Sequence, residues 1–235
     1  MNKRKLALCL GIAALLAGPC ARPAWADLYW ETESVSTNIS RQQTRTSIQK
    51  YYFTPKALRV ELGDSKVHIV DYDAMELYSL DTKAKTCTEM NLAEMPGLPG
   101  VSTADKNKVA EMIGAMMAIQ VTPTDELKTI AGYRCRKFNV RIAIMNGEYW
   151  VSEDVTGYRE LKTVGAKVGA IAEHNPILRQ IDVAGMVEKL GGFPVYTVNH
   201  LMGETVASTL RKIEQKSLDP ALFVVPEDYA VKKSM

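Results

Sequence analysis

Short β-rich segments that alternate with turns are the feature of this sequence that most restricts its fold. Between residues 28 and 92, stretches rich in β-branched and aromatic residues repeatedly give way to turn residues, as at Thr54-Pro55 and at Gly63-Asp64-Ser65. Strands at such spacing are typical of an antiparallel meander, in which each strand pairs with the preceding one. The expected strands are residues 28–35, 48–53, 57–62, 67–72, 76–80 and 86–92.

Apolar residues at helical spacing predict helices in the middle of the chain and again further on. In residues 104–120 the apolar positions fall on one stripe, as they do on an amphipathic helix. A second stripe runs from Tyr158 to Ile171, and a third covers residues 177–190. Gly191-Gly192 is the expected stop of the last helix, because glycine readily adopts the left-handed conformation that ends a helix.

Further strands follow each helical stretch and decide the fold class. The segments expected to be extended are residues 127–130, 135–144, 148–151, 194–200, 204–215 and 222–225. Ala131-Gly132 and Asn146-Gly147 are expected to form turns, and Asn-Gly is a strong signal for a two-residue hairpin. Strands and helices do not alternate regularly, which disfavours a parallel sheet. The sequence therefore predicts one α+β domain over residues 27–235, with a mainly antiparallel sheet.

Residues 1–26 have the three parts of a cleavable secretory signal peptide. The start is basic, residues 6–18 are apolar and uncharged, and Ala24-Trp25-Ala26 offers small residues where signal peptidase requires them. The apolar part is shorter than the roughly 20 residues that span a bilayer as a helix. We expect cleavage before Asp27 and a periplasmic or secreted protein. Two alternatives stay open, a buried N-terminal helix and a lipoprotein anchored through Cys20, although Pro19 is unusual before a lipidated cysteine.

Cleavage changes the charge of the protein. The leader carries four basic residues and no acidic ones, so the formal net charge falls from +2 to −2 when it is removed. The remaining 209 residues then offer no electrostatic case for binding nucleic acid. No later segment is apolar for long enough to span a membrane as a helix.

Cys87 and Cys135 are the cysteines that remain after cleavage. In an oxidising compartment two thiols can form a disulfide, and this one would stabilise the fold by roughly 2–4 kcal/mol. Each cysteine lies in an expected strand, so a cross-strand bridge is one expectation. Two separately buried thiols are the alternative.

The sequence contains no recognisable set of catalytic or metal-binding residues. A nucleophilic hydrolase places a Ser or Cys beside a His and a carboxylate, yet His68, His174 and His200 lie in different expected elements. The zinc and haem motifs are absent, and Asp71 with Asp73 offers too few oxygen ligands for a calcium loop. We therefore expect a protein that is not an enzyme and that has no metal or other cofactor.

Methionine is unusually frequent around residues 90–117, and three interpretations of it stay open. Thioethers bind Cu(I), so a copper-handling protein is one of them. Met112 and Met116 lie on the apolar stripe of the expected helix, which fits ordinary core packing. The flexible, polarizable side chain also suits the lining of an adaptable apolar cavity.

Several short motifs resemble those of an exported family of unknown function and occur in the same order. They are YFTPKALRV at 52–60, CTEM at 87–90, IAGYRCRKF at 130–138, EYWV at 148–151 and GFPV at 192–195. That family is similar to the LolA/LolB-like periplasmic lipoprotein carriers. The resemblance implies a half-barrel, in which a curved antiparallel sheet wraps around amphipathic helices and shelters an apolar cavity for acyl chains. The residues with which those carriers grip acyl chains have no counterpart that we can place here.

These observations lead to a binding function as the main hypothesis. We expect a carrier of a hydrophobic ligand, either a lipid or the acyl chain of a lipoprotein. The alternative is an envelope protein that docks a protein partner and binds no lipid. The expected ligand-binding residues are Val109, Met112, Ile113, Met116 and Ile119, with Trp30 and Trp150 as wall residues.

Overall fold

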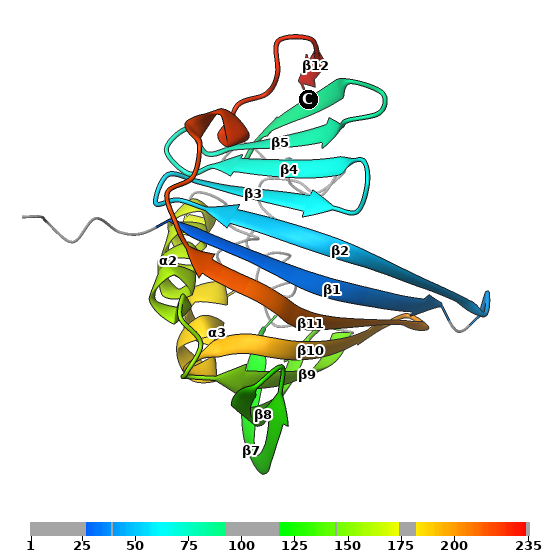
Figure 1. The fold of residues 1–235 in the computed structure, drawn as a ribbon, viewed down its shortest axis with the longest axis vertical. Coiled ribbons are helices and arrows are strands. Elements are labelled where there is room, and N and C mark those ends of the chain that lie inside the picture. Colours follow the sequence, from blue (N-terminus) through cyan, green and yellow to red (C-terminus); the bar gives the residue numbers. More distant parts are fainter. Residues whose placement is uncertain (1–26, 39, 93–117, 144, 174–181, 234–235) are drawn as a thin grey trace, which may run out of the picture.

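Twelve strands of the described residues form a single sheet, shown in Figure 1. The structure is a computed structural model, and it describes residues 27–38, 40–92, 118–143, 145–173 and 182–233. The strands are β1 (Leu28–Asn38), β2 (Gln43–Phe53), β3 (Ala57–Leu62), β4 (Lys66–Asp71), β5 (Glu76–Asp81), β6 (Thr86–Asn91), β7 (Gln120–Ile130), β8 (Tyr133–Ile142), β9 (Met145–Ser152), β10 (Phe193–Leu201), β11 (Glu204–Gln215) and β12 (Ala230–Lys233).

The sheet consists of two meanders that meet in its middle. Its order is β12-β6-β5-β4-β3-β2-β1-β11-β10-β9-β8-β7, so β1 and β11 join the N-terminal run to the C-terminal one. All pairs are antiparallel except that of β12 with β6. The sheet is curved, and it does not close because β12 and β7 stand at opposite ends of the order (Figure 1). The expected α+β class and the curved antiparallel sheet are thus confirmed.

Two helices, α2 (Tyr158–Glu173) and α3 (Val183–Leu190), pack against each other on one side of the sheet. They lie at the end where β1 begins, so that β1, β2 and β11 run far beyond them (Figure 1). The side chain of Asp182 accepts a hydrogen bond from the backbone N–H of Gly185 at 2.7 Å and caps α3. Gly191, with φ of 67°, ends it as expected. No helix among the described residues combines the length and hydropathy needed to cross a membrane.

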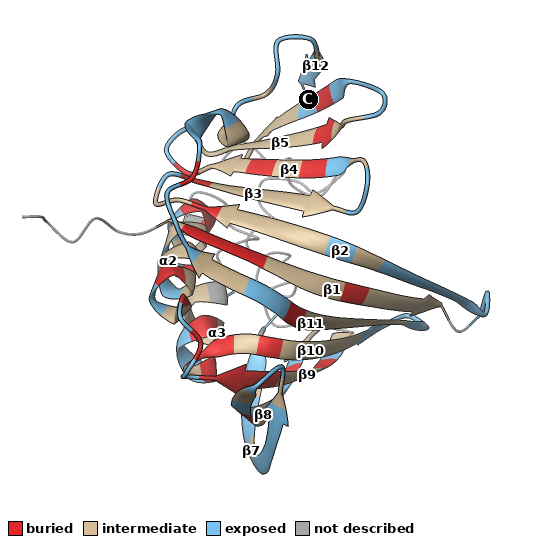
Figure 2. Cartoon of the chain, in the orientation of Figure 1, coloured by how far each residue is buried: buried red, intermediate tan, exposed pale blue. Residues whose placement is uncertain are grey.

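The hydrophobic core is concentrated where the helices cover the sheet. Leu28 and Trp30 of β1 and Phe53 of β2 are buried there, whereas β2 is exposed where it begins at Gln43 (Figure 2). Ile171 of α2 packs into the same cluster. Burial along β2 therefore increases from its exposed start to Phe53 at its end.

Two sequence predictions about local structure are wrong. Asn146 and Gly147 lie inside β9, and the hairpin reverses between Ile142 and Met145, which pair with each other. Residues 222–225 are not a strand, because Pro220–Phe223 forms a 3-10 helix, η2, capped by the side chain of Asp219. The turn at Ala131-Gly132 is confirmed, and both residues have the positive φ that a type I′ hairpin requires.

The expected helix 104–120 falls mostly outside the described residues. Only its end can be compared: residues 118 and 119 are not helical, and Gln120 already begins β7. The helix predicted from Tyr158 to Ile171 is confirmed as α2. The helix predicted over residues 177–190 is confirmed over Val183–Leu190, and residues 174–181 lie outside the described part of the chain.

The predicted Cys87–Cys135 disulfide is wrong, because both thiols are free and buried. Cys87 lies on β6 and packs with Val67, Ile69 and Leu80, whereas Cys135 lies on β8 in the cluster beneath the helices. Eight strands separate β6 from β8 in the sheet, far beyond the Cα separation of roughly 4.4–6.8 Å that a disulfide bridges. The alternative expectation, two separately buried thiols, is confirmed.

Candidate ligand-binding site

Most of the residues expected to line a cavity lie outside the part of the chain that the structure describes. This applies to Val109, Met112, Ile113 and Met116. Ile119 is described and is half-buried just before β7. It packs against a cluster formed by Phe138, Val140, Val151 and Leu190, which joins β8 and β9 to the end of α3. Ile119 therefore lies on the side of the sheet that carries the helices.

The two tryptophans expected as wall residues are both buried and belong to one hydrophobic cluster. The ring of Trp30 stacks on Tyr51 with centroids 4.6 Å apart, and the edge of Phe193 meets it at 5.9 Å. Offset-stacked and edge-to-face contacts of this kind add roughly 0.5–1.5 kcal/mol to the effect of burial. This part of the helix-covered end is filled by the protein's own side chains.

Trp150 has a different, partly polar surrounding. The ammonium groups of Lys128 and Lys137 each lie 5.9 Å from the centre of its ring. Lys137 also forms ion pairs with Glu126 at 3.1 Å and with Glu148 at 3.2 Å. The hydrogen bond from Lys137 to Glu126 raises the pKa of the lysine above its usual value. Two cations thus lie over the ring of Trp150, and one of them, Lys137, is paired with carboxylates.

A hollow of about 340 Å³ opens where α3 ends. The residues around it come from β7, β8, β9, α3 and the segment after β9, and they are Leu127, Arg134, Cys135, Arg136, Phe138, Val151, Glu153, Asp154 and Leu190. Strand alternation places Arg134, Arg136 and Phe138 on one face of β8. The register sets Leu127 and Val151 on either side of Arg136. The hollow therefore has an apolar floor and charged side chains at its edge.

The charged groups around this hollow are exposed, and among the described residues neither arginine has an ion-pair partner. Arg134, Arg136, Glu153 and Asp154 are all exposed. Among the described residues, the ion pairs within 4 Å do not include either arginine. Burial raises the pKa of Tyr158 at the start of α2, and nearby Glu188 and Glu153 add to that rise. Glu153 therefore lies near the start of α2.

Two other hollows have mainly polar linings. One of about 1350 Å³ runs along β1 to β4 where the β3–β4 hairpin ends, and Glu31, Arg45, Gln49 and Lys66 contribute to it. Another of about 440 Å³ lies between β7, β8, β9 and β10 and includes Arg141 and His200. Neither combines an apolar floor with the helix side of the sheet, so the hollow beside α3 is the better candidate for an apolar ligand.

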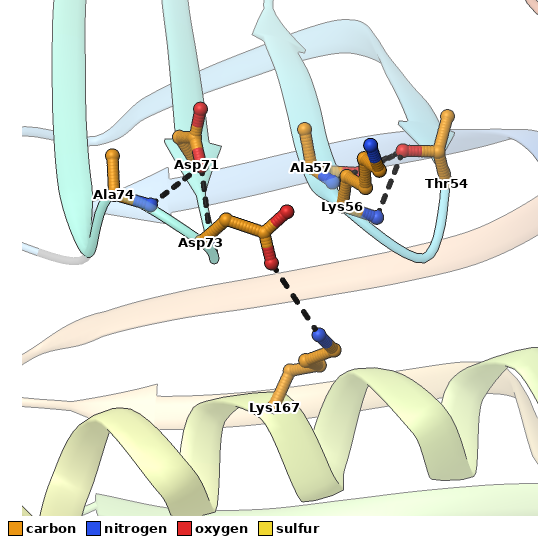
Figure 3. A network of polar contacts seen from close by, with 7 residues as sticks. All are labelled: Thr54, Lys56, Ala57, Asp71, Asp73, Ala74 and Lys167. Carbon is orange, nitrogen blue, oxygen red and sulfur yellow. Dashed lines mark hydrogen bonds and ion pairs between the residues drawn. The ribbon is translucent and has the colours of Figure 1, made fainter.

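One polar contact joins α2 to the N-terminal meander, as Figure 3 shows. Lys167 of α2 lies 3.9 Å from a carboxylate oxygen of Asp73 in the turn between β4 and β5. Asp71 shapes that turn, since its Oδ1 accepts hydrogen bonds from the backbone N–H groups of Asp73 and Ala74 at 2.9 Å each. Asp71 thus stabilises the turn, and Asp73 forms the contact between the sheet and α2.

The histidines of the described residues take part in cross-strand contacts. His68 Nδ1 lies 3.1 Å from Ser79 Oγ, and His200 Nδ1 lies 2.9 Å from Thr205 Oγ1. His174 falls outside the described ranges. Within those ranges no group of three or more His, Cys, Asp or Glu side chains is placed to hold a metal ion.

Sequence reasoning missed the residues that shape the hollow. Arg134 and Arg136 occur within the motif 130–138, and their i, i+2 spacing in a strand signals a shared face. Nothing in the sequence tells that α3 ends beside that face. The site therefore depends on a contact between elements more than fifty residues apart, Phe138 with Leu190.

A family model described as a domain of unknown function, DUF4412, matches residues 34–229. The chain belongs to the DUF4412 family. The expected membership of a family of unknown function is thereby confirmed. No curated protein matches the sequence of this DUF4412 chain.

Several solved structures are similar to this DUF4412 chain at low sequence identity. PNGF-II is 12% identical with a TM-score of 0.41, and the match covers 89% of this chain but only 31% of that structure. A LolA superfamily protein from Nitrosomonas europaea is 6% identical with a TM-score of 0.37, covering 86% and 91% of the two chains. LprF from Mycobacterium bovis is 13% identical with a TM-score of 0.33, covering 86% and 90%. At these values, function has to be inferred from the residues of the DUF4412 chain itself.

Proposed function

We propose that this protein binds a hydrophobic ligand with an acyl chain, a lipid or the chain of a lipoprotein, in the hollow beside α3. It does so as a periplasmic or secreted carrier and not as an enzyme. One observation carries the proposal. The described helices cover only one end of the curved sheet, and where α3 stops, an apolar floor of Leu127, Phe138, Val151 and Leu190 stays open.

The size and chemistry of this hollow suit part of an acyl chain. Its volume of about 340 Å³ is at the lower end of the range typical of small-molecule pockets, roughly 300–1,000 Å³. Each CH₂ group removed from water contributes about 0.8 kcal/mol, so several buried groups give measurable affinity. In this proposal Val109, Met112, Ile113, Met116 and Ile119 extend the apolar lining, with Trp30 and Trp150 as wall residues.

Extraction of the purified protein tests the proposal directly. The protein is purified from its native compartment without detergent, extracted with organic solvent and examined by mass spectrometry. We expect a lipid in stoichiometric amount and a rise in melting temperature when fatty acids are added to the extracted protein. Absence of lipid together with no thermal shift would contradict the carrier function.

A second candidate function is an envelope protein that docks a partner without binding lipid. It is favoured by exposed apolar side chains far from the helices, because Met202 is 87% exposed at the β10–β11 turn and Leu201 beside it is also exposed. Replacing both with serine and repeating chemical crosslinking in intact cells tests this role. Loss of a crosslinked partner with unchanged lipid content would favour docking. An unchanged set of crosslinked partners would rule out docking through these two residues.

A further inference from the structure

The two arginines beside α3 are arranged to hold one anionic group together. They are two residues apart on β8, which sets their Cα atoms about 7 Å apart on the same face. Phe138 continues that face and packs in one cluster with Leu190 of α3, so both guanidinium groups lie on the face that meets the end of α3. Guanidinium groups suit phosphate well, because their planar N–H donors form two parallel hydrogen bonds to its oxygens.

Carboxylates line the same hollow. The register that pairs Arg136 with Val151 leads directly to Glu153 and Asp154, which follow the end of β9. Burial raises the pKa of the Cys135 thiol, and the carboxylate of Asp154 adds to the rise, which places Asp154 near β8. Leu190 is the last residue of α3, where the backbone carbonyls add partial negative charge.

The hollow thus offers two cationic groups, two anionic groups and an apolar floor. A purely anionic ligand leaves the carboxylates repelling it, and a neutral ligand leaves all four charged groups unused. A headgroup with a phosphate and an ammonium group matches both pairs.

We infer that the hollow beside α3 is the headgroup site for a zwitterionic phospholipid, whose phosphate is held by Arg134 and Arg136 and whose ammonium group is held by Glu153 and Asp154. The acyl chain lies over Leu127, Phe138 and Leu190. This inference rests on the proposed function and specifies its ligand class.

Equilibrium dialysis with radiolabelled single-chain probes below their micelle concentrations tests the headgroup preference. The probes are palmitoyl lysophosphatidylethanolamine, palmitoyl lysophosphatidylglycerol and hexadecanol, which carry a zwitterionic, an anionic and a neutral headgroup. We expect the extracted full-length mature protein to bind the zwitterionic probe about 10-fold more tightly than hexadecanol, with the anionic probe between them. Raising the salt concentration should reduce these differences, because exposed charges are screened.

Charge-neutralising variants assign the roles. The double variant Arg134→Gln with Arg136→Gln should bind both phospholipid probes about 10-fold more weakly than the wild type does. Its affinity for hexadecanol should be unchanged. Glu153→Gln with Asp154→Asn should weaken only the zwitterionic probe. The matched control is Arg141→Gln, on the same strand but outside this hollow, which should change none of the three affinities. Circular dichroism melting confirms folding, and Arg136→Gln alone provides the readout if the double variant does not fold.

The outcomes separate this inference from the proposed function. If all three probes bind alike and the arginine variants bind as the wild type does, the headgroup site is wrong while acyl-chain binding stands. Preference for the anionic probe over the zwitterionic one also overturns it. If no probe binds, the proposed function fails and the headgroup site with it.

Discussion

The middle of the sheet beneath α2 and the hollow at the end of α3 are built differently. In the middle, Trp30, Tyr51 and Phe193 are in direct ring contact. At the end of α3, Leu127 and Leu190 face a space of about 340 Å³ with charged groups around it.

This difference indicates that one region serves mainly folding and the other serves ligand binding. The packed centre supplies the free energy of folding, since buried aromatic side chains remove large apolar areas from water. The open end buries Phe138, Val151 and Leu190 as well, but it leaves Leu127 exposed to the hollow. Changes in the two regions should therefore affect different measurements.

Replacing Trp30 with alanine should have the largest effect on stability. Removing a buried aromatic ring from a packed core costs about 3–5 kcal/mol of unfolding free energy. Urea unfolding followed by circular dichroism measures the change. A loss below about 1 kcal/mol would show that this region is not close-packed.

Replacing Asp182 with alanine should have an intermediate effect that links the two regions. Loss of this helix cap costs about 1 kcal/mol, and it loosens the helix that positions Leu190. We expect a lower midpoint of urea unfolding and weaker binding of hexadecanol. Unchanged binding would mean that α3 does not form a wall of the ligand site.

Replacing Leu127 with serine should change binding and not folding. Leu127 is 51% exposed at the hollow, and exposed positions of this kind alter stability by less than about 0.5 kcal/mol. Hexadecanol affinity should fall several-fold. Ile48→Ser is the matched control, because Ile48 is 42% exposed on β2, away from the hollow. Equal affinities in the two variants would remove the distinction between the hollow and other exposed apolar positions.

Adding a reductant should not change the melting temperature, which makes it the smallest of the expected effects. Both thiols are free, so the melting temperature should not change, whereas a disulfide of this loop length would contribute roughly 2–4 kcal/mol. Burial raises the pKa of Cys87 and of Cys135, so the neutral thiols are favoured in the folded state. The two thiols contribute fully to the stability of the folded state below the ordinary thiol pKa. This contribution is lost as the pH rises through their raised pKa values.

Alkaline melting curves check the sign of this linkage. A variant with alanine at both cysteines should lose less stability than the wild type when the pH is raised above the ordinary thiol pKa. A steeper loss in the variant, or a fall in melting temperature on reduction of the wild type, would contradict free buried thiols.

Much of the fold followed from local sequence patterns. Period-two alternation located most strands, helical stripes located α2, and Gly191 marked the end of α3, because each of these depends on neighbouring residues alone. Asn146-Gly147 was misleading for a specific reason. A Cβ atom at Gly147 would lie 2.5 Å from Asn199 Oδ1, so this glycine serves close packing of β9 against β10 instead of a turn.

The site was harder to predict because it is formed between distant segments. Strand positions alone do not tell that β6 and β8 stand in opposite halves of the sheet, which is why the disulfide expectation failed. The same limit applies to Arg136, whose role depends on where α3 ends. Only the order of the strands and the helix contact bring these residues into one place.

Photo-crosslinking with a diazirine-bearing palmitate analogue tests most directly whether the open end of the helix-covered side is the ligand site. After irradiation of the extracted protein, peptide mass spectrometry locates the attachment points. We predict that labels concentrate in residues 127–138 and in the peptide ending at Leu190, and that palmitate competes with labelling. Labels spread over the outer face, or none that palmitate displaces, would contradict the account.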